Sequence, residues 1–283
     1  MTEQSDPIGG YYLKAELSKS RDGTAEFQRF HAEHRGIVDY TLLVTQLVSR
    51  ADDVVRIATK ALYEHGIDSD ISAEAYEERI KNGAGVMKVF RKHRNMFVQM
   101  IVCRCVDNYL CFVSDLLHAI FLARPESLKS SEQERLDFIL QHQSFDELIA
   151  AIAEKRVHQL SYQGMDSIAA YFENRLGLTM FENDEERTAI IDLIQCRNLI
   201  VHNRGKVNAL YVGKVASSKL TIGDVVDFDA DELFMSIDRI CAAGVHLEQA
   251  ARTKFSLKAV DVTSESAADL KKDNSSPISQ PSA

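Results

Sequence analysis

Proline is almost absent from the interior of this chain. The sequence has 283 residues and four prolines, of which only Pro125 lies between residues 8 and 276. Proline lacks the backbone N–H that a helix needs, and its ring clashes with the preceding turn. A stretch of this length with a single proline favours long helices over many short strands and turns. We therefore expect an all-α protein, built as a helical bundle.

Apolar residues recur at helical spacing along most of the chain. The spacing predicts helices over residues 24–65 (one helix or two in succession), 71–81, 86–122, 132–142, 145–160, 165–176, 183–203 and 230–251. Three residue pairs have the capping-box spacing that marks a helix start. They are Ser131 with Glu134, Ser144 with Glu147, and Asp229 with Glu232. Residues 219–228 alternate weakly, as a short hairpin or strand does.

The composition changes along the chain and suggests four regions. Residues 1–23 are polar and contain glycine, so we expect a flexible N-terminus. Residues 24–82 form an N-terminal helical region, and residues 86–260 form the main helical domain. The tail 261–283 is too polar to bury a core, and we expect it to be disordered.

The longest apolar run is expected to be a core helix rather than a membrane span. It extends over residues 96–123 and contains Arg104, Asp107, Asp115 and His118. Charges at these intervals are costly in a bilayer. Its aromatic residues are expected to pack in the core rather than to stack on nucleobases; they are Tyr109, Phe112 and Phe121.

The start of the chain and the cysteines point to the cytoplasm. No basic segment followed by an apolar one occurs at the N-terminus, so we expect no secretory signal. Five cysteines, an odd number, lie on apolar helical patterns and are expected to be reduced core residues. They are Cys103, Cys105, Cys111, Cys196 and Cys241. We therefore predict a cytoplasmic protein without a membrane partner.

The charge is unevenly distributed. The net charge of −9 argues against non-specific coating of nucleic acid. Two windows nevertheless contain no acidic residue, 79–106 and 193–223. Their cations are Arg79, Lys81, Lys88, Arg91, Lys92, Arg94 and Arg104 in the first window, and Arg197, Arg204, Lys206, Lys214 and Lys219 in the second. Such windows are consistent with a local anion site, or with chance clustering on solvated helix faces.

The segment "IQCRNLIVHNRGKVN", residues 194–208, places Arg197, Asn198 and His202 in a strongly apolar helix. A helix that is apolar on all sides is expected to be enclosed. Asn198 and His202 are four residues apart and share a face, and Gly205 is placed to adopt a left-handed stop. The three polar residues form either a functional site or a structural cluster. In the structural alternative, Arg197 pairs with Asp107 or Asp115, and His202 caps carbonyl groups at the helix end.

The segment "RNLIVHN" followed by "RG" resembles the signature of the HEPN superfamily, in which arginine is followed by histidine after four to six residues. The resemblance covers about Val86–Lys254 and implies an all-α domain that dimerises, with the two motifs meeting across a cleft. Many members of this family are metal-independent endoribonucleases, and some serve as toxins or phage-defence effectors. Other members are non-catalytic RNA-binding or scaffold modules, and this alternative stays open.

The resemblance implies RNA cleavage by attack of the 2′-OH, with no metal and no cofactor. Arg197 would hold the scissile phosphate, His202 would transfer protons, and Asn198 would orient either of these groups. Further cations are candidates for RNA binding; they are Arg204, Lys206, Arg91, Lys92 and Arg94. The expected partners are RNA, a second copy in a homodimer, and an antitoxin or other regulatory protein.

The bare arginine–histidine spacing also occurs between Arg29 and His34 and between Arg135 and His142. Neither pair has the asparagine, and both are expected to lie on solvated helix faces. A third segment, "RNMFVQ", carries Gln99 where histidine is needed, and glutamine does not transfer protons. His31 and His34 would supply only two metal ligands. No phosphate-binding glycine loop, zincin motif or nucleophile elbow occurs in the sequence.

Overall fold

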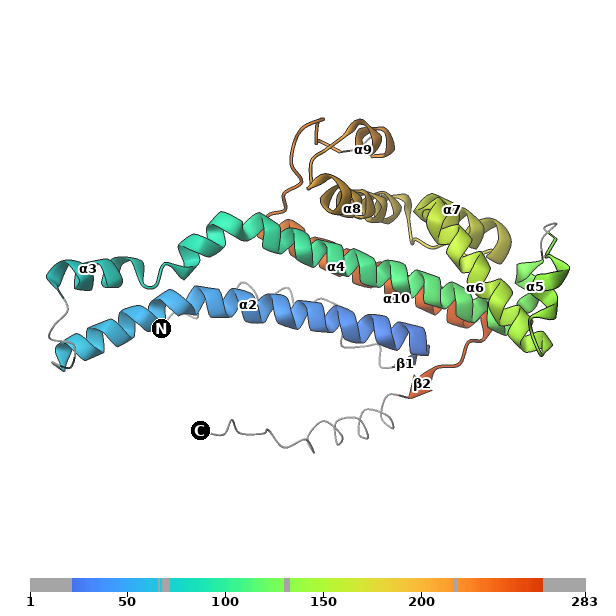
Figure 1. Ribbon diagram of the computed structural model, residues 1–283, viewed down its shortest axis with the longest axis horizontal. Coiled ribbons are helices and arrows are strands. Elements are labelled where there is room, and N and C mark those ends of the chain that lie inside the picture. Colours follow the sequence, from blue (N-terminus) through green and yellow to red (C-terminus); the bar gives the residue numbers. More distant parts are fainter. Residues whose placement is uncertain (1–21, 66, 68–71, 130–132, 216–217, 262–283) are drawn as a thin grey trace. The chain divides into compact units, whose positions relative to one another are not determined.

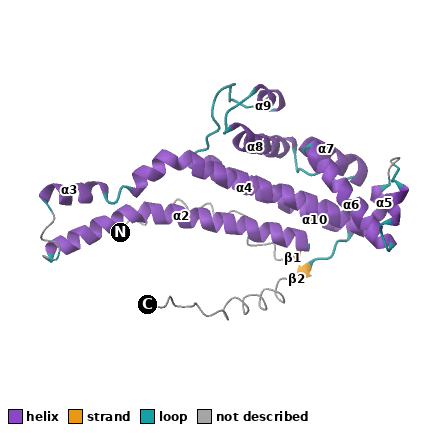
Figure 2. Cartoon of the chain, in the orientation of Figure 1, coloured by secondary structure: helices purple, strands orange, loops and turns teal. Residues whose placement is uncertain are grey.

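The computed structural model describes residues 22–65, 67, 72–129, 133–215 and 218–261. The predictions for residues 1–21, for the tail after residue 261 and for the cap at Ser131 lie outside these residues. Helices make up nearly all of the regular structure in the described part of the chain (Figure 2). The protein is an all-α helical bundle, as the scarcity of proline predicts.

The described helices have the following bounds: α2 Ala25–Glu64, α3 Ala73–Asn82, α4 Val86–Ala123, α5 Leu136–Leu140, α6 Phe145–Gln163, α7 Met165–Tyr171, α8 Asp184–Asn203, α9 Ala209–Lys214 and α10 Ala230–Phe255. A 3₁₀ turn, η2, covers Pro125–Leu128, and a π-helical turn, η3, covers Phe172–Leu176. Two short strands, β1 Asp22–Gly23 and β2 Val260–Asp261, pair antiparallel. The first predicted helix is a single helix of 40 residues (Figure 1).

Three local predictions differ from the structure. Helix α5 is shorter than the predicted span 132–142, and the short helix α9 was not predicted. Residues 219–228 do not form a hairpin with themselves. Their backbone pairs instead with residues 205–207, where the N–H of Val207 donates to Asp224 and the N–H of Val226 donates to Gly205, both at 2.8 Å. Cross-chain pairing of this kind is set by tertiary packing, which alternation alone does not encode.

The described chain divides into two compact units. Unit 1 comprises the described residues of Met1–Ala32, Asn108–Ile191 and Asp238–Ala283, and unit 2 comprises those of Glu33–Asp107 and Asp192–Ile237. Helices α2, α4, α8 and α10 each contribute residues to both units. The predicted boundary between residues 82 and 86 stays a prediction.

Aromatic side chains form the core of unit 1. The rings of Phe30 and Phe112 stack with their centroids 4.9 Å apart, and Tyr109 meets Phe30 edge-on. Tyr109, Phe112 and Phe121 are all buried, which confirms that these three aromatic residues of α4 are core residues. Helix α10 approaches this cluster closely, because a Cβ atom at Gly244 would lie 2.4 Å from the Phe30 ring.

Unit 2 contains a helical hairpin whose turn is held by one carboxylate. Helices α2 and α4 are joined through α3 (Figure 1), and the buried side chain of Asp52 on α2 accepts hydrogen bonds from the backbone N–H groups of Val86 and Met87. These are free donors of the first turn of α4, which has no acidic residue of its own. Gly83 ends α3 with a φ of 60°, and a Cβ there would lie within 2.7 Å of Asp52.

The two predicted caps that lie in the described residues are present. The Ser144 hydroxyl accepts from the N–H of Glu147 at the start of α6. At the start of α10, Asp229 and Glu232 each accept from the backbone N–H of the other. This reciprocal pattern is the complete capping box that the sequence predicts.

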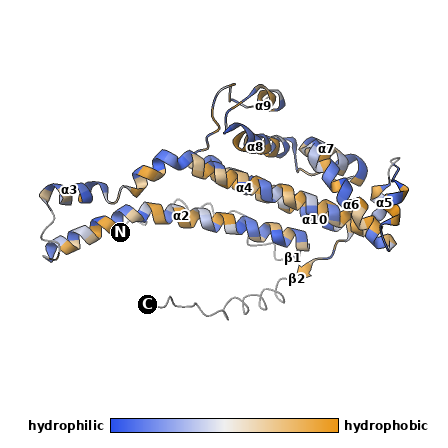
Figure 3. Ribbon diagram, viewed as in Figure 1, coloured by the Kyte–Doolittle hydropathy of each residue, from blue (hydrophilic) through white to orange (hydrophobic). Residues whose placement is uncertain are grey.

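All five cysteines are thiols rather than disulfides, but they are not all core residues. Cys105, Cys196 and Cys241 are buried, Cys103 is half-buried, and Cys111 is exposed, so the core prediction is wrong for Cys111. Among the described residues, one stretch within Ala73–Ala123 is long and apolar enough to cross a membrane by length and composition alone. Half of its most apolar window is buried inside the molecule. Figure 3 colours the chain by hydropathy, and many residues of α4 are apolar.

Candidate active site at the end of helix α8

The three predicted catalytic residues lie in the part of α8 that belongs to unit 2. The prediction of an enclosed helix fails in its last turn, where Val201 is 51% exposed and His202 and Asn203 are exposed as well. Arg197 and Asn198 are half-buried. The polar end of the helix is therefore open to solvent.

Arg197 forms an ion pair with Asp107 of α4. Its Nε lies 2.7 Å from Asp107 Oδ1, and its Nη1 donates to Asn198 Oδ1 at 3.2 Å. Both partners of the ion pair keep part of their surface exposed, 24% for the arginine side chain and 34% for the aspartate. Within the described residues Nη2 makes no hydrogen bond. Burial raises the pKa of the neighbouring Cys103 thiol, Asp107 adds to this effect, and Arg197 opposes it.

Asp115, the other acid considered as a partner of Arg197, lies instead 3.6 Å from Arg29. The two pairs with similar spacing are not equivalent to the α8 motif. His34 is buried rather than solvated, so that prediction is wrong for the first pair, and Arg135 is bound to Asp137.

His202 and Asn198 line an open pocket of about 410 Å³ between α8 and α9. Asn208, Tyr211 and Lys214 line the same pocket, which we call the α8–α9 pocket. Arg197 does not line it, because its side chain points toward α4. Within the described residues the imidazole of His202 makes no hydrogen bond or ion pair, so both ring nitrogens are available to a ligand. Asn198 links the pocket to the guanidinium of Arg197.

Tyr211, which lines this pocket, belongs to a part-buried polar network that the sequence patterns did not predict. The Tyr211 hydroxyl donates to Asp192 Oδ1 at 2.7 Å and lies 2.9 Å from Ser218 Oγ. Burial raises the pKa of Tyr211, and burial also raises that of Cys196, which contacts both Asp192 and Tyr211. The feature of the sequence that points to this network is Asp192, a charged residue inside the apolar run "IIDLIQC".

The turn after α8 carries a strained backbone. The N–H of Gly205 donates to the carbonyl of Leu199, six residues back, and so satisfies one of the last carbonyl groups of the helix. Gly205 has a positive φ of 74°, as predicted, and Arg204 also adopts the left-handed region with a φ of 54°. A left-handed conformation costs a non-glycine residue free energy. The turn therefore holds the exposed Arg204 close to His202 at a conformational cost.

The predicted RNA-binding cations differ in their surroundings. Arg91, Lys92, Arg204 and Lys206 are exposed. Arg94 is not a free cation: its Nη1 donates to the carbonyl of Phe228, and its Nη2 donates to both carboxylate oxygens of Asp227. This arrangement argues against direct RNA binding by Arg94, because its donors already hold the loop before α10.

The two acid-free windows meet at Gln99. Its amide donates to the carbonyl of Val226, and the same amide nitrogen lies 2.8 Å from the position of a Cβ at Gly205. The glutamine that replaces histidine in "RNMFVQ" therefore supports the turn that follows the α8 motif. Any side chain at residue 205 would displace this contact.

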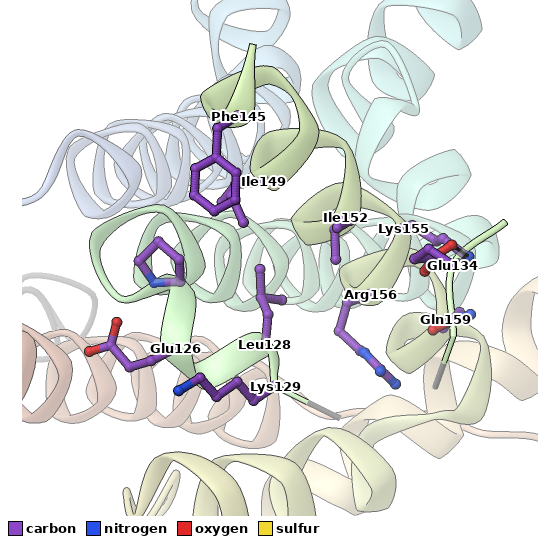
Figure 4. A pocket seen from close by; sticks show the side chains of 11 residues that line it. Glu126, Leu128, Lys129, Glu134, Phe145, Ile149, Ile152, Lys155, Arg156 and Gln159 are labelled. Carbon is purple, nitrogen blue, oxygen red and sulfur yellow. Dashed lines mark hydrogen bonds and ion pairs between the residues drawn. The ribbon is translucent and has the colours of Figure 1, made fainter. Parts of the chain in front are cut away.

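Two further pockets lie in unit 1 and contain no predicted site residue. One, of about 410 Å³, has apolar side chains from Leu128, Ile149 and Ile152 pointing into it, with Lys129 and Arg156 at its edge (Figure 4). The other, of about 420 Å³, is lined by several carboxylates and would repel an anionic ligand. Among the described residues no group of three or more histidine, cysteine or acidic side chains is placed to bind a metal ion.

No family model, curated protein or solved structure was found to match this chain.

Proposed function

We propose that the protein is a metal-independent endoribonuclease of the HEPN type, acting at the α8–α9 pocket. The observation that carries the proposal is the exposed, unpaired His202 in a pocket that also contains Asn198 and Lys214. A general acid or base must be open to its substrate, and an imidazole can gain or lose a proton near neutral pH. A lysine in the same pocket provides positive charge for a phosphodiester.

Arg197 supports this chemistry from the edge of the site. Two of its nitrogens are engaged, Nε by Asp107 and Nη1 by Asn198, and Nη2 remains for a phosphate oxygen. Asp107 holds the guanidinium in one orientation, so little side-chain entropy is lost when a phosphate binds. Charge that develops on the phosphate during the reaction would strengthen this contact.

The proposed reaction uses the nucleophile that RNA carries. The 2′-OH attacks the adjacent phosphorus, a base removes its proton, and an acid protonates the departing 5′-oxygen. The products are a 2′,3′-cyclic phosphate and a free 5′-OH, and no water or metal takes part. In a homodimer the second His202 would supply the second proton-transfer group.

RNA cleavage in EDTA tests the proposal. We expect the wild type to cleave, His202→Ala to lose about 10²-fold or more of the rate, and the products to end in a cyclic phosphate. His93, an exposed histidine on α4, is a matched control, and His93→Ala should cleave as the wild type does. Equal cleavage by wild type and His202→Ala would contradict the proposal.

A second function is favoured by the ion pair between Arg197 and Asp107. A charge pair that links α8 to α4 can stabilise a non-catalytic RNA-binding or scaffold module. In that case removal of Arg197 lowers the melting temperature, and His202→Ala changes neither RNA cleavage nor folding. Asp107→Asn separates the two functions. In a ribonuclease the variant should lose both stability and RNA cleavage, whereas in a scaffold it should lose stability alone, because neither the scaffold nor its variant cleaves RNA.

The proposed setting is cytoplasmic, as a homodimer that acts on RNA without a membrane partner. The resemblance favours a toxin or phage-defence effector that is controlled by an antitoxin or another regulatory protein. Arg91, Lys92, Arg204 and Lys206 are proposed as additional RNA contacts because all four are exposed.

A further inference from the structure

Helix α2 carries an exposed apolar stripe on its portion in unit 2. Its members lie three or four residues apart, and each is between 53% and 69% exposed: Tyr40, Leu43, Leu47, Val54 and Ile57. Arg50 and Ala61, both exposed, complete the series 40, 43, 47, 50, 54, 57 and 61. Alternating steps of three and four residues are the a and d positions of a heptad repeat. We call these seven positions the α2 seam.

The seam does not face the core of its own unit. The opposite side of the same helix segment is buried, and there the fully buried side chains are polar: Thr41, Asp52 and Thr59. They are 11 and 7 residues apart and share the face that packs within the unit with the half-buried Val44, Val48 and Val55. Apolar side chains therefore lie on both sides of this segment, as in a helix that is enclosed on both sides. A helix with this pattern needs an apolar partner on its outer face.

We propose that the α2 seam pairs with the same seam of a second copy, in antiparallel orientation. In a parallel, in-register pair the two Arg50 side chains would meet in the interface. In the antiparallel pair whose register places residue i opposite residue 97 − i, Arg50 faces Leu47 of the second copy. Tyr40 then meets Ile57 of the second copy, and Leu43 meets Val54 of the second copy.

Charge at the edge of the seam favours the same register. The a positions of the seam are residues 40, 47, 54 and 61. Asp39 directly precedes the first of them, and Lys60 directly precedes the last. In the antiparallel pair these two positions lie beside each other, so each end of the interface joins an aspartate to a lysine. Lys60 lies 3.8 Å from Glu64 of its own helix, but both side chains are more than half exposed and can rearrange. Asp39 also has an interaction within its own chain, and its side chain is exposed. The charges therefore select a second copy of this chain as the occupant.

The seam is long enough for a specific contact. It covers three heptads, the smallest number of heptads that indicates a coiled coil. At about 1.5 Å per residue this is about 32 Å of helix. The proposal rests on α2 alone and does not depend on the chemistry of His202.

Analytical ultracentrifugation of the full chain over a wide concentration range tests the pairing. We expect a concentration-dependent dimer in the wild type, and a monomer in Leu43→Glu/Val54→Glu, because residues 43 and 54 face each other in the proposed register and two like charges would meet at the seam. Ser49→Glu adds the same side chain to an exposed position of the same helix outside the seam, and this control should still dimerise. A wild type that stays monomeric at all concentrations overturns the proposal, and so does a monomer that binds lipid vesicles through the seam.

Charge exchange tests the orientation. Asp39→Lys and Lys60→Asp should each weaken the dimer by roughly tenfold, because two ion pairs become two like-charge pairs. The double variant Asp39→Lys/Lys60→Asp should recover the wild-type affinity, since both pairs re-form with their signs reversed. Additive weakening in the double variant would exclude the antiparallel register. Circular dichroism of each variant shows whether the helices are intact.

Discussion

At the scale of single residues, Tyr109 contains a buried hydroxyl without a partner. The side chain is 1% exposed, and within the described residues its hydroxyl makes no hydrogen bond. Burial raises the pKa of this phenol well above its usual range. A buried donor left unsatisfied costs about 1–3 kcal/mol. The ring itself is needed, because it packs against Phe30.

We therefore predict that Tyr109→Phe raises the free energy of unfolding by about 1 kcal/mol. The phenylalanine keeps the ring contact and removes the unpaired hydroxyl. Urea denaturation of the two proteins measures the change, and Tyr211→Phe is the contrasting variant. That substitution should destabilise the protein, because the Tyr211 hydroxyl is bonded to Asp192 and Ser218.

Two helical glycines should respond in opposite directions to the same substitution. A Cβ at Gly244 would lie 2.4 Å from the buried Phe30 ring, so Gly244→Ala should destabilise the protein by about 1–3 kcal/mol. A Cβ at Gly36 would meet nothing within 4 Å. Gly36→Ala should therefore stabilise helix α2 by up to about 1 kcal/mol. Thermal denaturation of both variants checks the pair, and a stabilising Gly244→Ala would disprove the close packing.

At the scale of elements, Asp52 of α2 holds the first turn of α4. Burial alone would raise the pKa of this carboxyl, but hydrogen bonds from the backbone N–H groups of Met87, Val86 and Ala84 outweigh burial and lower it. A carboxyl whose pKa is lowered by folding stabilises the folded state above its unfolded pKa, about 3.9. This stabilisation is lost as the pH falls through the pKa that the carboxyl has in the folded state.

We predict that Asp52→Asn lowers the melting temperature at pH 7, because the amide presents one acceptor in place of two. The difference from the wild type should shrink as the pH is lowered below about 4, where the wild-type carboxyl also becomes neutral. Melting curves from pH 3 to pH 7 measure the effect. Asp53→Asn, a change at the exposed neighbouring position, should show little dependence of this kind.

At the scale of the whole molecule, the loop before α10 depends on a distant arginine. Arg94 binds residues more than 130 positions later in the chain, through Phe228 and Asp227. Arg94→Ala should lower stability by about 1 kcal/mol, whereas Arg91→Ala should leave it unchanged. If RNA binds as proposed, Arg91→Ala should instead weaken binding. Melting curves together with RNA affinities at fixed salt separate the two roles, and equal effects on stability would contradict the assignment.

The locally encoded part of the fold could be predicted from the sequence. The bounds of α2, α3, α4 and α8 lie within a few residues of the predicted spans, and the capping box of Asp229 and Glu232 is complete. Helix starts and stops are set by side chains within about four residues of the helix end. The apolar spacing of α4 likewise identified its buried aromatic residues.

The sequence also brought Arg197, Asn198 and His202 to one helix end, and named Asp107 as one of two possible partners of Arg197. Only the tertiary structure chose Asp107, left Val201 and His202 open to solvent, and joined Asp192, Tyr211 and Ser218 in one network. It alone also showed that an apolar stripe of α2 is left exposed. The physical reason is range: caps and helical periodicity act within a few residues, whereas ion pairs and exposure depend on which distant segments pack together.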